Sequence, residues 1–148
     1  TDLTLGQLQR RLYAIFSAAG ADKPMTVSVM SFGYKYGIPI EADLVFDVRF
    51  LPNPYYDAAL RDKSGLDAPV REYVFGSSLT EEFFRRLTDL IEFLLPYYIE
   101  DGRRNITVCI GCTGGRHRSV AVAEALRNFL VEKGYPAESV HRDIDKSQ

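Results

Sequence analysis

The sequence predicts a single α/β domain in which a mainly parallel sheet is flanked by helices. Short runs rich in β-branched and aromatic residues alternate along the chain with longer segments of helical periodicity, a pattern typical of this class. The 148 residues, 46% of them hydrophobic, suffice for one substantial core and give no sign of a second. A glycine-rich segment joins one predicted strand to one predicted helix, which places a phosphate-binding loop at a strand-to-helix junction.

The first third of the chain predicts one helix followed by two strands. Thr4 and Gln7 form a predicted capping box, and apolar residues at helical spacing then continue until Gly20. These apolar residues are Leu5, Leu8, Leu12, Ile15 and Phe16. Met25–Phe32 and Leu44–Phe50 are short and rich in β-branched and aromatic residues, and glycine and proline clusters follow them. Both segments are therefore expected to be buried strands.

The remaining elements alternate in the same way. Ser78 and Glu81 form a second predicted capping box, and the helix that follows is expected to end at Pro96. Ile106–Gly111 predicts a strand, and a helix follows it before a final strand at Ser139–Ile144. The apolar face of that helix consists of Val122, Leu126, Phe129 and Leu130.

Composition limits the expected cellular location of the protein and the classes of partner that it binds. The net charge of −2 and the isoelectric point near 5.7 argue against a general nucleic-acid binder. No signal peptide or membrane-spanning run is recognised, and a cytoplasmic, membrane-free location is expected. Cys109 and Cys112 form a Cys-x-x-Cys pair, but Cys109 lies within a strand run, which favours a buried hydrophobic role. Two cysteines and two distant histidines predict no metal site, and no cofactor is expected.

The segment Cys112–Ser119 is predicted to bind phosphate. Its glycines let a ligand approach the backbone, and its amides stand at the start of a helix, where anions are favoured. Arg116, His117 and Arg118 add cationic partners. A glycine pair after a strand is often only a tight turn, but three consecutive basic residues favour phosphate binding here.

The same segment also has the spacing of a cysteine-dependent phosphatase. Cys112 is followed after five residues by Arg118 and then by a serine, so a thiolate nucleophile beside an arginine is an alternative function. Asp47 or Asp57 would then have to protonate the leaving group. Gly111 stands where that signature usually has a histidine.

Several residues outside the loop have two interpretations. Asp47 and Arg49 alternate with apolar residues, and they form either an internal salt bridge or part of a ligand site. Tyr55 and Tyr56 follow a Pro-Asn-Pro turn, where packing is the more usual role. Lys35 lies in a glycine-bounded loop, and the sequence does not separate a solvated lysine from a phosphate ligand.

Four blocks of sequence point to a known family. They are Ser31–Gly37 (SFGYKYG), Phe46–Pro54 (FDVRFLPNP), Gly65–Asp67 (GLD) and Ile110–Ser119 (IGCTGGRHRS). Together they closely resemble the carboxy-terminal domain of the RapZ/YvcJ family of bacterial RNase adapters and nucleotide-binding proteins. The resemblance implies that the chain is a single ligand-sensing domain, residues 1–148, of a longer protein. Thr1 stands close to the first predicted helix, which also suggests a domain taken from a longer chain.

The resemblance also implies a ligand and its contacts. The domain would sense a phosphorylated amino sugar, glucosamine-6-phosphate, and contribute to RNA contact, to an RNase adapter role and to homo-oligomer assembly. Family members that sense this sugar tend to have histidine at the position of Tyr55, so a nucleotide sugar such as UDP-N-acetylglucosamine is an alternative ligand. The expected ligand-binding residues are Asp47, Tyr55, Thr113, Gly114, Gly115, His117, Arg118 and Ser119.

Hydrolysis of a nucleotide is not expected from this chain. The amino-terminal domain of the family carries a nucleotide-binding P-loop, and no Gly-x-x-x-x-Gly-Lys-Ser/Thr pattern occurs here. ATP or GTP hydrolysis would therefore belong to an amino-terminal domain absent from this chain. The domain itself is expected to be regulatory, with the cysteine phosphatase as the alternative and an RNA-binding adapter module as a third interpretation.

Overall fold

The computed structural model describes residues 4, 5, 7 and 25–146. The amide of Thr4 donates to Oε1 of Gln7 at 3.0 Å, and the amide of Gln7 donates to Oγ1 of Thr4 at 3.1 Å. This reciprocal pair is the predicted capping box. The rest of the predicted first helix lies outside the described residues.

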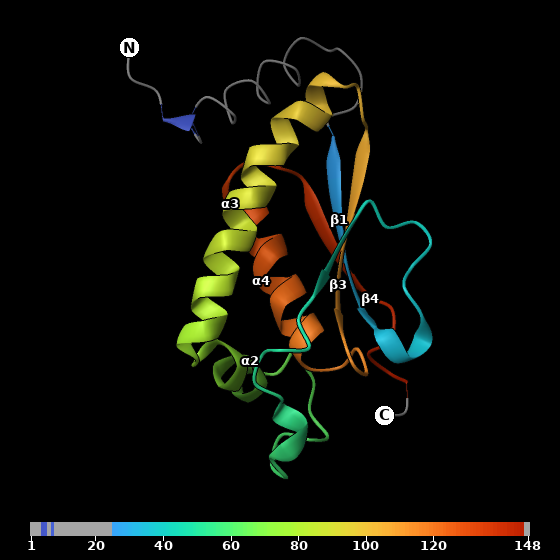
Figure 1. Cartoon of the computed structure of the whole chain (residues 1–148), viewed down its shortest axis with the longest axis vertical. Helices are drawn as coiled ribbons and strands as arrows, with labels where there is room; N and C mark the ends of the chain where they lie inside the picture. The colour runs from blue at the N-terminus through green and yellow to red at the C-terminus, as the bar shows by residue number, and fades with distance from the viewer. Residues whose placement is uncertain (1–3, 6, 8–24, 147–148) are drawn as a thin grey trace.

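A parallel sheet of four strands forms the centre of the domain (Figure 1). The strands are β1 (Thr26–Gly33), β2 (Leu44–Asp47), β3 (Asn105–Cys112) and β4 (Ala137–His141). They lie in the order β2-β3-β1-β4, and every pairing is parallel. The predicted α/β class is confirmed. Parallel pairing brings the carboxyl ends of β1, β2 and β3 to one edge of the sheet, where the registers pair Gly33 with Cys112 and Asp47 with Gly111.

Two strands end earlier than the sequence predicts. The predicted strand Leu44–Phe50 ends at Asp47, because the Asp47 carboxylate accepts the amide of Arg49 and turns the chain. This strand is at the edge of the sheet and is only half-buried, so the expectation of a buried strand is wrong there. The final strand lies at Ala137–His141 instead of Ser139–Ile144, and the chain beyond it turns into the carboxy-terminal segment.

Within residues 25–146, three α-helices accompany the sheet: α2 (Ala68–Phe75), α3 (Ser78–Glu100) and α4 (Arg118–Glu132). The cap of α3 is Ser77, whose hydroxyl accepts the amide of Leu79, so the cap lies one residue before the predicted Ser78. Pro96 lies inside α3 and does not end it, because the buried Leu95 and the half-buried residues after it hold the last turn against the core. Helix α2 has only two buried residues, which left no periodic signal to predict it from.

The core forms where α4 packs on the sheet. Figure 1 shows α4 between the strands and the longer α3, so the two helices make successive layers on one side of the sheet. Buried residues of α4 include Val122, Leu126 and Leu130, which agrees with the predicted apolar face. In the part of the chain that the structure describes, no helix combines the length and the hydropathy needed to cross a bilayer.

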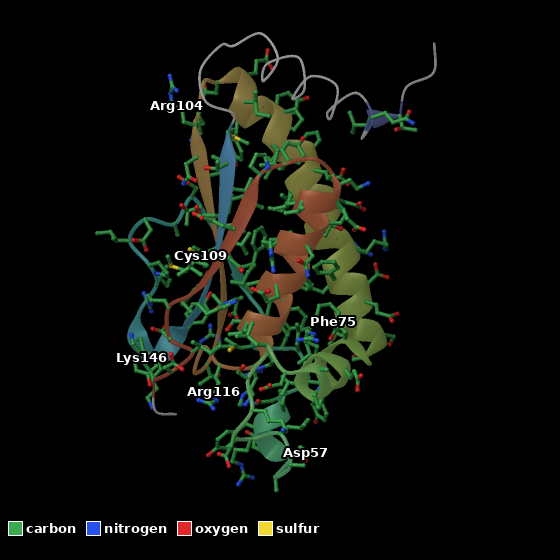
Figure 2. The ribbon with its side chains drawn as sticks, turned by 180° about the vertical axis from the view of Figure 1, so that it is seen from behind. Asp57, Phe75, Arg104, Cys109, Arg116 and Lys146 are labelled. Carbon is green, nitrogen blue, oxygen red and sulfur yellow. The ribbon has the colours of Figure 1, made fainter. Side chains whose placement is uncertain are left out.

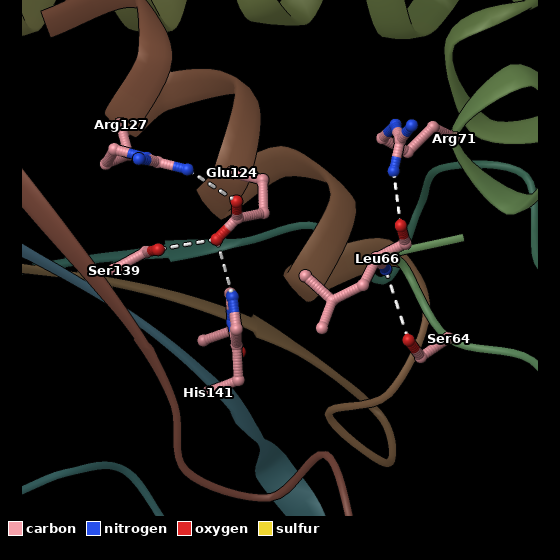
Figure 3. Close-up of polar contacts among 8 residues, drawn as sticks. Ser64, Leu66, Arg71, Glu124, Arg127, Ser139 and His141 are labelled. Carbon is pink, nitrogen blue, oxygen red and sulfur yellow. Dashed lines mark hydrogen bonds and ion pairs between the residues drawn. The ribbon is translucent and has the colours of Figure 1, made fainter. Parts of the chain in front are cut away.

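A polar cluster fastens the edge strand β4 to α4 (Figure 3). The carboxylate of Glu124 accepts hydrogen bonds from Arg127, from the hydroxyl of Ser139 and from Nε2 of His141, the last at 2.7 Å. The other ring nitrogen of His141 lies 2.7 Å from Oγ of Ser31 in β1. Burial would raise the pKa of Glu124, but these hydrogen bonds outweigh it and lower the pKa. The cluster stabilises β4, and none of its residues lines the pocket described next.

Candidate anion-binding site

The predicted phosphate loop connects β3 to α4, and two glycine-containing segments pack tightly around it. Gly115 has a φ of 81°, which favours glycine, and a Cβ there would lie 2.6 Å from the amide nitrogen of Gly33. A Cβ on Gly33 would in turn lie 2.5 Å from the carbonyl carbon of Gly114. The backbone at the end of β1 therefore packs directly against the backbone of the loop, and no side chain larger than hydrogen fits at Gly33 or Gly115.

The thiol of Cys112 lies at the base of this loop. Its Sγ accepts the amide of Gly115 at 3.3 Å and lies 3.1 Å from Oγ of Ser119, and the side chain is buried. Ser119 is thus placed by the sulfur atom and does not line the pocket. The amide hydrogen bond and the hydroxyl contact hold the sulfur atom at the base of the loop.

Arg118 connects the loop to the chain segment after β2. Its side chain is 5% exposed, and its Nη1 donates to the carbonyl of Arg49 and, at 3.3 Å, to that of Leu51. Nη2 donates to the hydroxyl of Thr113 at 3.4 Å, whereas the buried Nε has no hydrogen-bond partner among the residues that the structure describes. The guanidinium therefore positions two loops as well as lining the pocket.

His117 is held as a neutral ring. Its Nε2 donates to the carbonyl of Arg61 at 3.0 Å, and the ring is buried. Burial lowers the pKa of His117 below 6.5, and the nearby charge of Arg116 lowers it further against the effect of the carbonyl hydrogen bond. His117 thus forms part of the pocket wall without carrying a positive charge at neutral pH, in contrast to the cationic role that the sequence predicted for it.

Arg116 spans the outside of the loop. Its guanidinium donates to the carbonyls of Asp62, Lys63 and Ile144, the last two at 3.1 and 3.3 Å. Figure 2 shows Arg116 and Lys146 at the same end of the molecule. This arginine therefore joins two separate chain segments to the loop.

A pocket of about 270 Å³ opens beside the loop. It is lined by Lys35, Asn53, Tyr55, Tyr56, Cys112, Thr113, Gly114, Arg116, His117 and Arg118. Five of the eight predicted ligand residues are in this set, namely Tyr55, Thr113, Gly114, His117 and Arg118. Lys35, which the sequence left undecided, also lines the pocket.

Asn53 was not predicted as a site residue. Its Oδ1 accepts the amide of Tyr55, an arrangement that the Pro-Asn-Pro turn signals in the sequence. The turn therefore marks Asn53 as a capping residue, but nothing local shows that its amide also reaches the pocket.

Asp47 lies outside the lining of the pocket. Nε and Nη2 of Arg49 bind its carboxylate, the latter at 2.6 Å, and the guanidinium stacks 3.9 Å from the ring centre of Tyr34. These hydrogen bonds from Arg49 hold the pKa of Asp47 below its usual value. The internal salt bridge considered from the sequence is present, and a sugar contact by Asp47 stays a prediction.

Asp143, in the carboxy-terminal segment, is the buried anchor that sequence reasoning missed. Its carboxylate is fully buried and accepts the amide of Gly33 at 2.8 Å, together with Nζ of Lys146 at 2.6 Å and the side chain of Arg142. Burial would raise its pKa, but these partners outweigh burial and lower the pKa. Asp143 also lies against Gly115, because a Cβ on that glycine would be 2.9 Å from the Asp143 Cβ.

Of the cysteine pair and the two candidate acids, Cys112 alone lines the pocket. Cys109 is buried within β3, and this burial raises its pKa to about 11, as expected for a small hydrophobic role. Asp57 accepts the amide of Ala59 and, like every other carboxylate, is absent from the pocket lining among the described residues. Within residues 25–146 and the three described before them, no group of histidine, cysteine and acidic residues has the arrangement of a metal site.

The parallel sheet and the loop at its carboxyl edge define an α/β domain with a candidate anion-binding pocket. The family model of the RapZ C-terminal domain matches residues 25–145, and the chain belongs to that family. This agrees with the resemblance that the four sequence blocks predicted.

Close relatives carry the name nucleotide-binding protein. One from Caldicellulosiruptor saccharolyticus is 50% identical over 139 residues, which cover 94% of this chain and 47% of that relative. Another from Finegoldia magna is 49% identical over 97% of this chain and 50% of its own length. A third from Heliobacterium modesticaldum is 46% identical over the whole chain and covers 49% of that protein. The chain therefore spans about half the length of the curated relatives it matches.

Proposed function

We propose that this chain is a regulatory domain that binds a phosphorylated amino sugar or a nucleotide sugar at the loop between β3 and α4. Glucosamine-6-phosphate and UDP-N-acetylglucosamine are the two ligands considered. The observation that carries the proposal is the pocket itself, where Thr113 and Gly114 at the start of a helix face Lys35, Arg116 and Arg118. Amides and cations of this kind suit the oxygens of a phosphate group.

The size and lining of the pocket favour binding over turnover. A volume of about 270 Å³ is close to the lower end of small-molecule pockets, which suits a phosphorylated monosaccharide. No carboxylate lines it among the described residues, so no positioned acid is available to protonate a leaving group. Asn53 and the two neighbouring tyrosines offer neutral polar groups to the sugar hydroxyls.

The wider role of the domain is proposed from its family. Contact with RNA, an RNase adapter role, assembly into homo-oligomers and a cytoplasmic location are all part of this proposal. ATP or GTP binding and hydrolysis are assigned to a part of the longer relatives that the chain does not cover. Basic side chains near the pocket, including Lys35 and Arg116, are suited to phosphate groups of RNA as well as of a small ligand.

Calorimetric titration tests the binding proposal. Glucosamine-6-phosphate or UDP-N-acetylglucosamine should bind saturably, whereas glucosamine without phosphate should bind at least tenfold more weakly. Lys35→Ala should weaken binding of the phosphorylated ligand, while Lys133→Ala serves as the matched control, because Lys133 lies at the far end of α4 beside Glu92. Equal binding of glucosamine and its phosphate, or no binding of any phosphorylated compound, would refute the proposal.

A cysteine phosphatase is the second candidate. It is favoured by one observation, the contact of both Gly115 and Ser119 with Sγ of Cys112. Hydrolysis of an aryl phosphate that is lost in Cys112→Ser would support this activity, since an aryl leaving group needs little help from an acid. Saturable ligand binding without any hydrolysis would support the regulatory domain.

A further inference from the structure

An exposed aromatic ring stands at the mouth of the phosphate pocket. Tyr56 is 80% exposed, more than any other aromatic side chain among the exposed hydrophobic residues of the described chain. It lines the same pocket as Lys35 and the loop residues Thr113 and Gly114. Its position, more than its exposure, distinguishes it from an ordinary surface tyrosine.

The turn that carries Tyr56 is rigid. Residues Pro54–Tyr56 form a short 3-10 helix, η2, which is capped by the side chain of Asn53 and anchored by the buried Pro54. The guanidinium of Arg61 lies 5.0 Å from the ring centre of Tyr55, and its Nε donates to the Tyr55 carbonyl at 2.8 Å. These contacts hold the backbone of the turn that carries Tyr56, so little main-chain freedom is lost when a ligand binds there.

The two tyrosines have different surroundings. Tyr55 packs against Arg61 and makes an edge contact with Tyr56, with ring centres 6.0 Å apart and planes at 83°. Since Tyr56 remains 80% exposed despite this contact, at least one face of its ring is open. Aromatic faces of this kind bind nucleobases in a way that tolerates different bases.

The dimensions of the pocket agree with a ligand that extends to this ring. The observed volume of about 270 Å³ is on the scale of a sugar phosphate, so a base attached to that sugar would extend toward the edge of the pocket. The base of a nucleotide bound through its phosphate would therefore lie at the mouth, where Tyr56 stands. Lys35 and Arg116 in the same lining supply charge for a phosphate group.

We infer that Tyr56 is a stacking platform for the base of a nucleoside phosphate whose phosphate occupies the loop at Thr113 and Gly114. The inference rests on the proposed function, and it selects the nucleotide class from the two ligand classes considered there. Tyr56 sets specificity, whereas the loop supplies the anion contacts that any phosphorylated ligand shares.

Calorimetry with three probes tests this inference on the 148-residue chain. Uridine 5′-monophosphate carries base and phosphate, ribose 5-phosphate lacks the base, and uridine lacks the phosphate. The nucleotide should bind at least about fivefold more tightly than ribose 5-phosphate, which is the smallest gain expected from one stacked base. Tyr56→Ala should abolish this preference, so that the nucleotide binds no more tightly than ribose 5-phosphate, while Tyr56→Phe should keep the preference.

Tyr73→Ala is the matched control, because Tyr73 is 39% exposed on α2 and does not line the pocket. This variant should retain the full preference for the nucleotide. If ribose 5-phosphate binds as tightly as the nucleotide, or if Tyr56→Ala keeps the preference, the platform is overturned while the phosphate loop stands. If glucosamine-6-phosphate, ribose 5-phosphate and the nucleotide all fail to bind, the proposed function itself fails.

Discussion

Replacing Arg118 by alanine should destabilise the fold as well as weaken the site. Nη1 of Arg118 donates to the carbonyls of Arg49 and Leu51, and the side chain is 5% exposed. Each hydrogen bond from a charged donor contributes about 1.5–3 kcal/mol, so the two together contribute about 3–6 kcal/mol. Alanine also removes the cost of burying a guanidinium, which offsets part of this loss. We therefore expect the free energy of unfolding to fall by about 2–4 kcal/mol.

Urea denaturation followed by far-UV circular dichroism measures this loss directly. The transition midpoint should fall with little change in the slope, as for a variant with the same folded state and lower stability. Arg118→Lys should lie between the wild type and alanine, because lysine keeps the charge but not the forked geometry. Arg85→Ala is the control, since Arg85 pairs with Glu82 on the exposed face of α3 and should cost less than about 1 kcal/mol. A loss below about 0.5 kcal/mol in Arg118→Ala would refute the structural role assigned to its hydrogen bonds.

Three further predictions concern Cys112, Asp143 and Cys109. Cys112→Ser should keep its affinity for a phosphorylated ligand within about threefold of the wild type, because a hydroxyl can replace the sulfur as hydrogen-bond partner of Gly115. Calorimetry measures this affinity, and a tenfold loss would mean that the thiol itself contacts the ligand. Asp143 has a folded-state pKa below 3.8, so its stabilising contribution is present above that pH and is lost as the pH falls through the lowered value. Asp143→Asn should therefore be less stable than the wild type at pH 7 in urea denaturation, and the difference should shrink in acid; a constant difference would contradict this linkage. Burial raises the pKa of Cys109 to about 11, so this thiol should not react with iodoacetamide at pH 8 until urea unfolds the chain. Mass spectrometry detects the alkylation, and rapid alkylation of Cys109 in the folded protein would contradict its burial within β3.

Local sequence patterns predicted the sheet and the loop, because both depend on short-range signals. Runs of β-branched residues marked β1 and β3, and the glycines before α4 marked the junction where the backbone must turn sharply. Errors arose where tertiary contacts decided the outcome. Packing of the residues after Pro96 against the core carried α3 past a proline that alone would predict its end.

The site was predicted mainly where it is continuous in sequence, and of the lining residues that distant segments supply, Tyr55 alone was predicted, from the family resemblance. Thr113, Gly114, His117 and Arg118 lie in one motif, whereas Lys35 and Asn53 reach the pocket from two other loops. The sequence also did not distinguish the roles of the consecutive basic residues in the loop. His117 and Arg118 are adjacent in sequence, yet their roles differ. His117 is a neutral ring that donates a hydrogen bond to one carbonyl, whereas Arg118 is a charged side chain that donates to two carbonyls. Only the fold determines which carbonyls lie beside each of them.

The packing of Gly33 against Gly114 and Gly115 restricts how the length of the chain can vary. The end of β1, the phosphate loop and the carboxy-terminal segment are in direct contact there, because the Asp143 side chain lies beside Gly115 and its carboxylate accepts the amide of Gly33. An inserted residue at any of these positions would displace the other two stretches, and with them the amides that face the pocket. The segment 57–64 lies outside this glycine contact, but the carbonyls of its residues 61–63 accept hydrogen bonds from His117 and Arg116. We therefore expect a change of length there to move the outer rim of the pocket together with these two side chains.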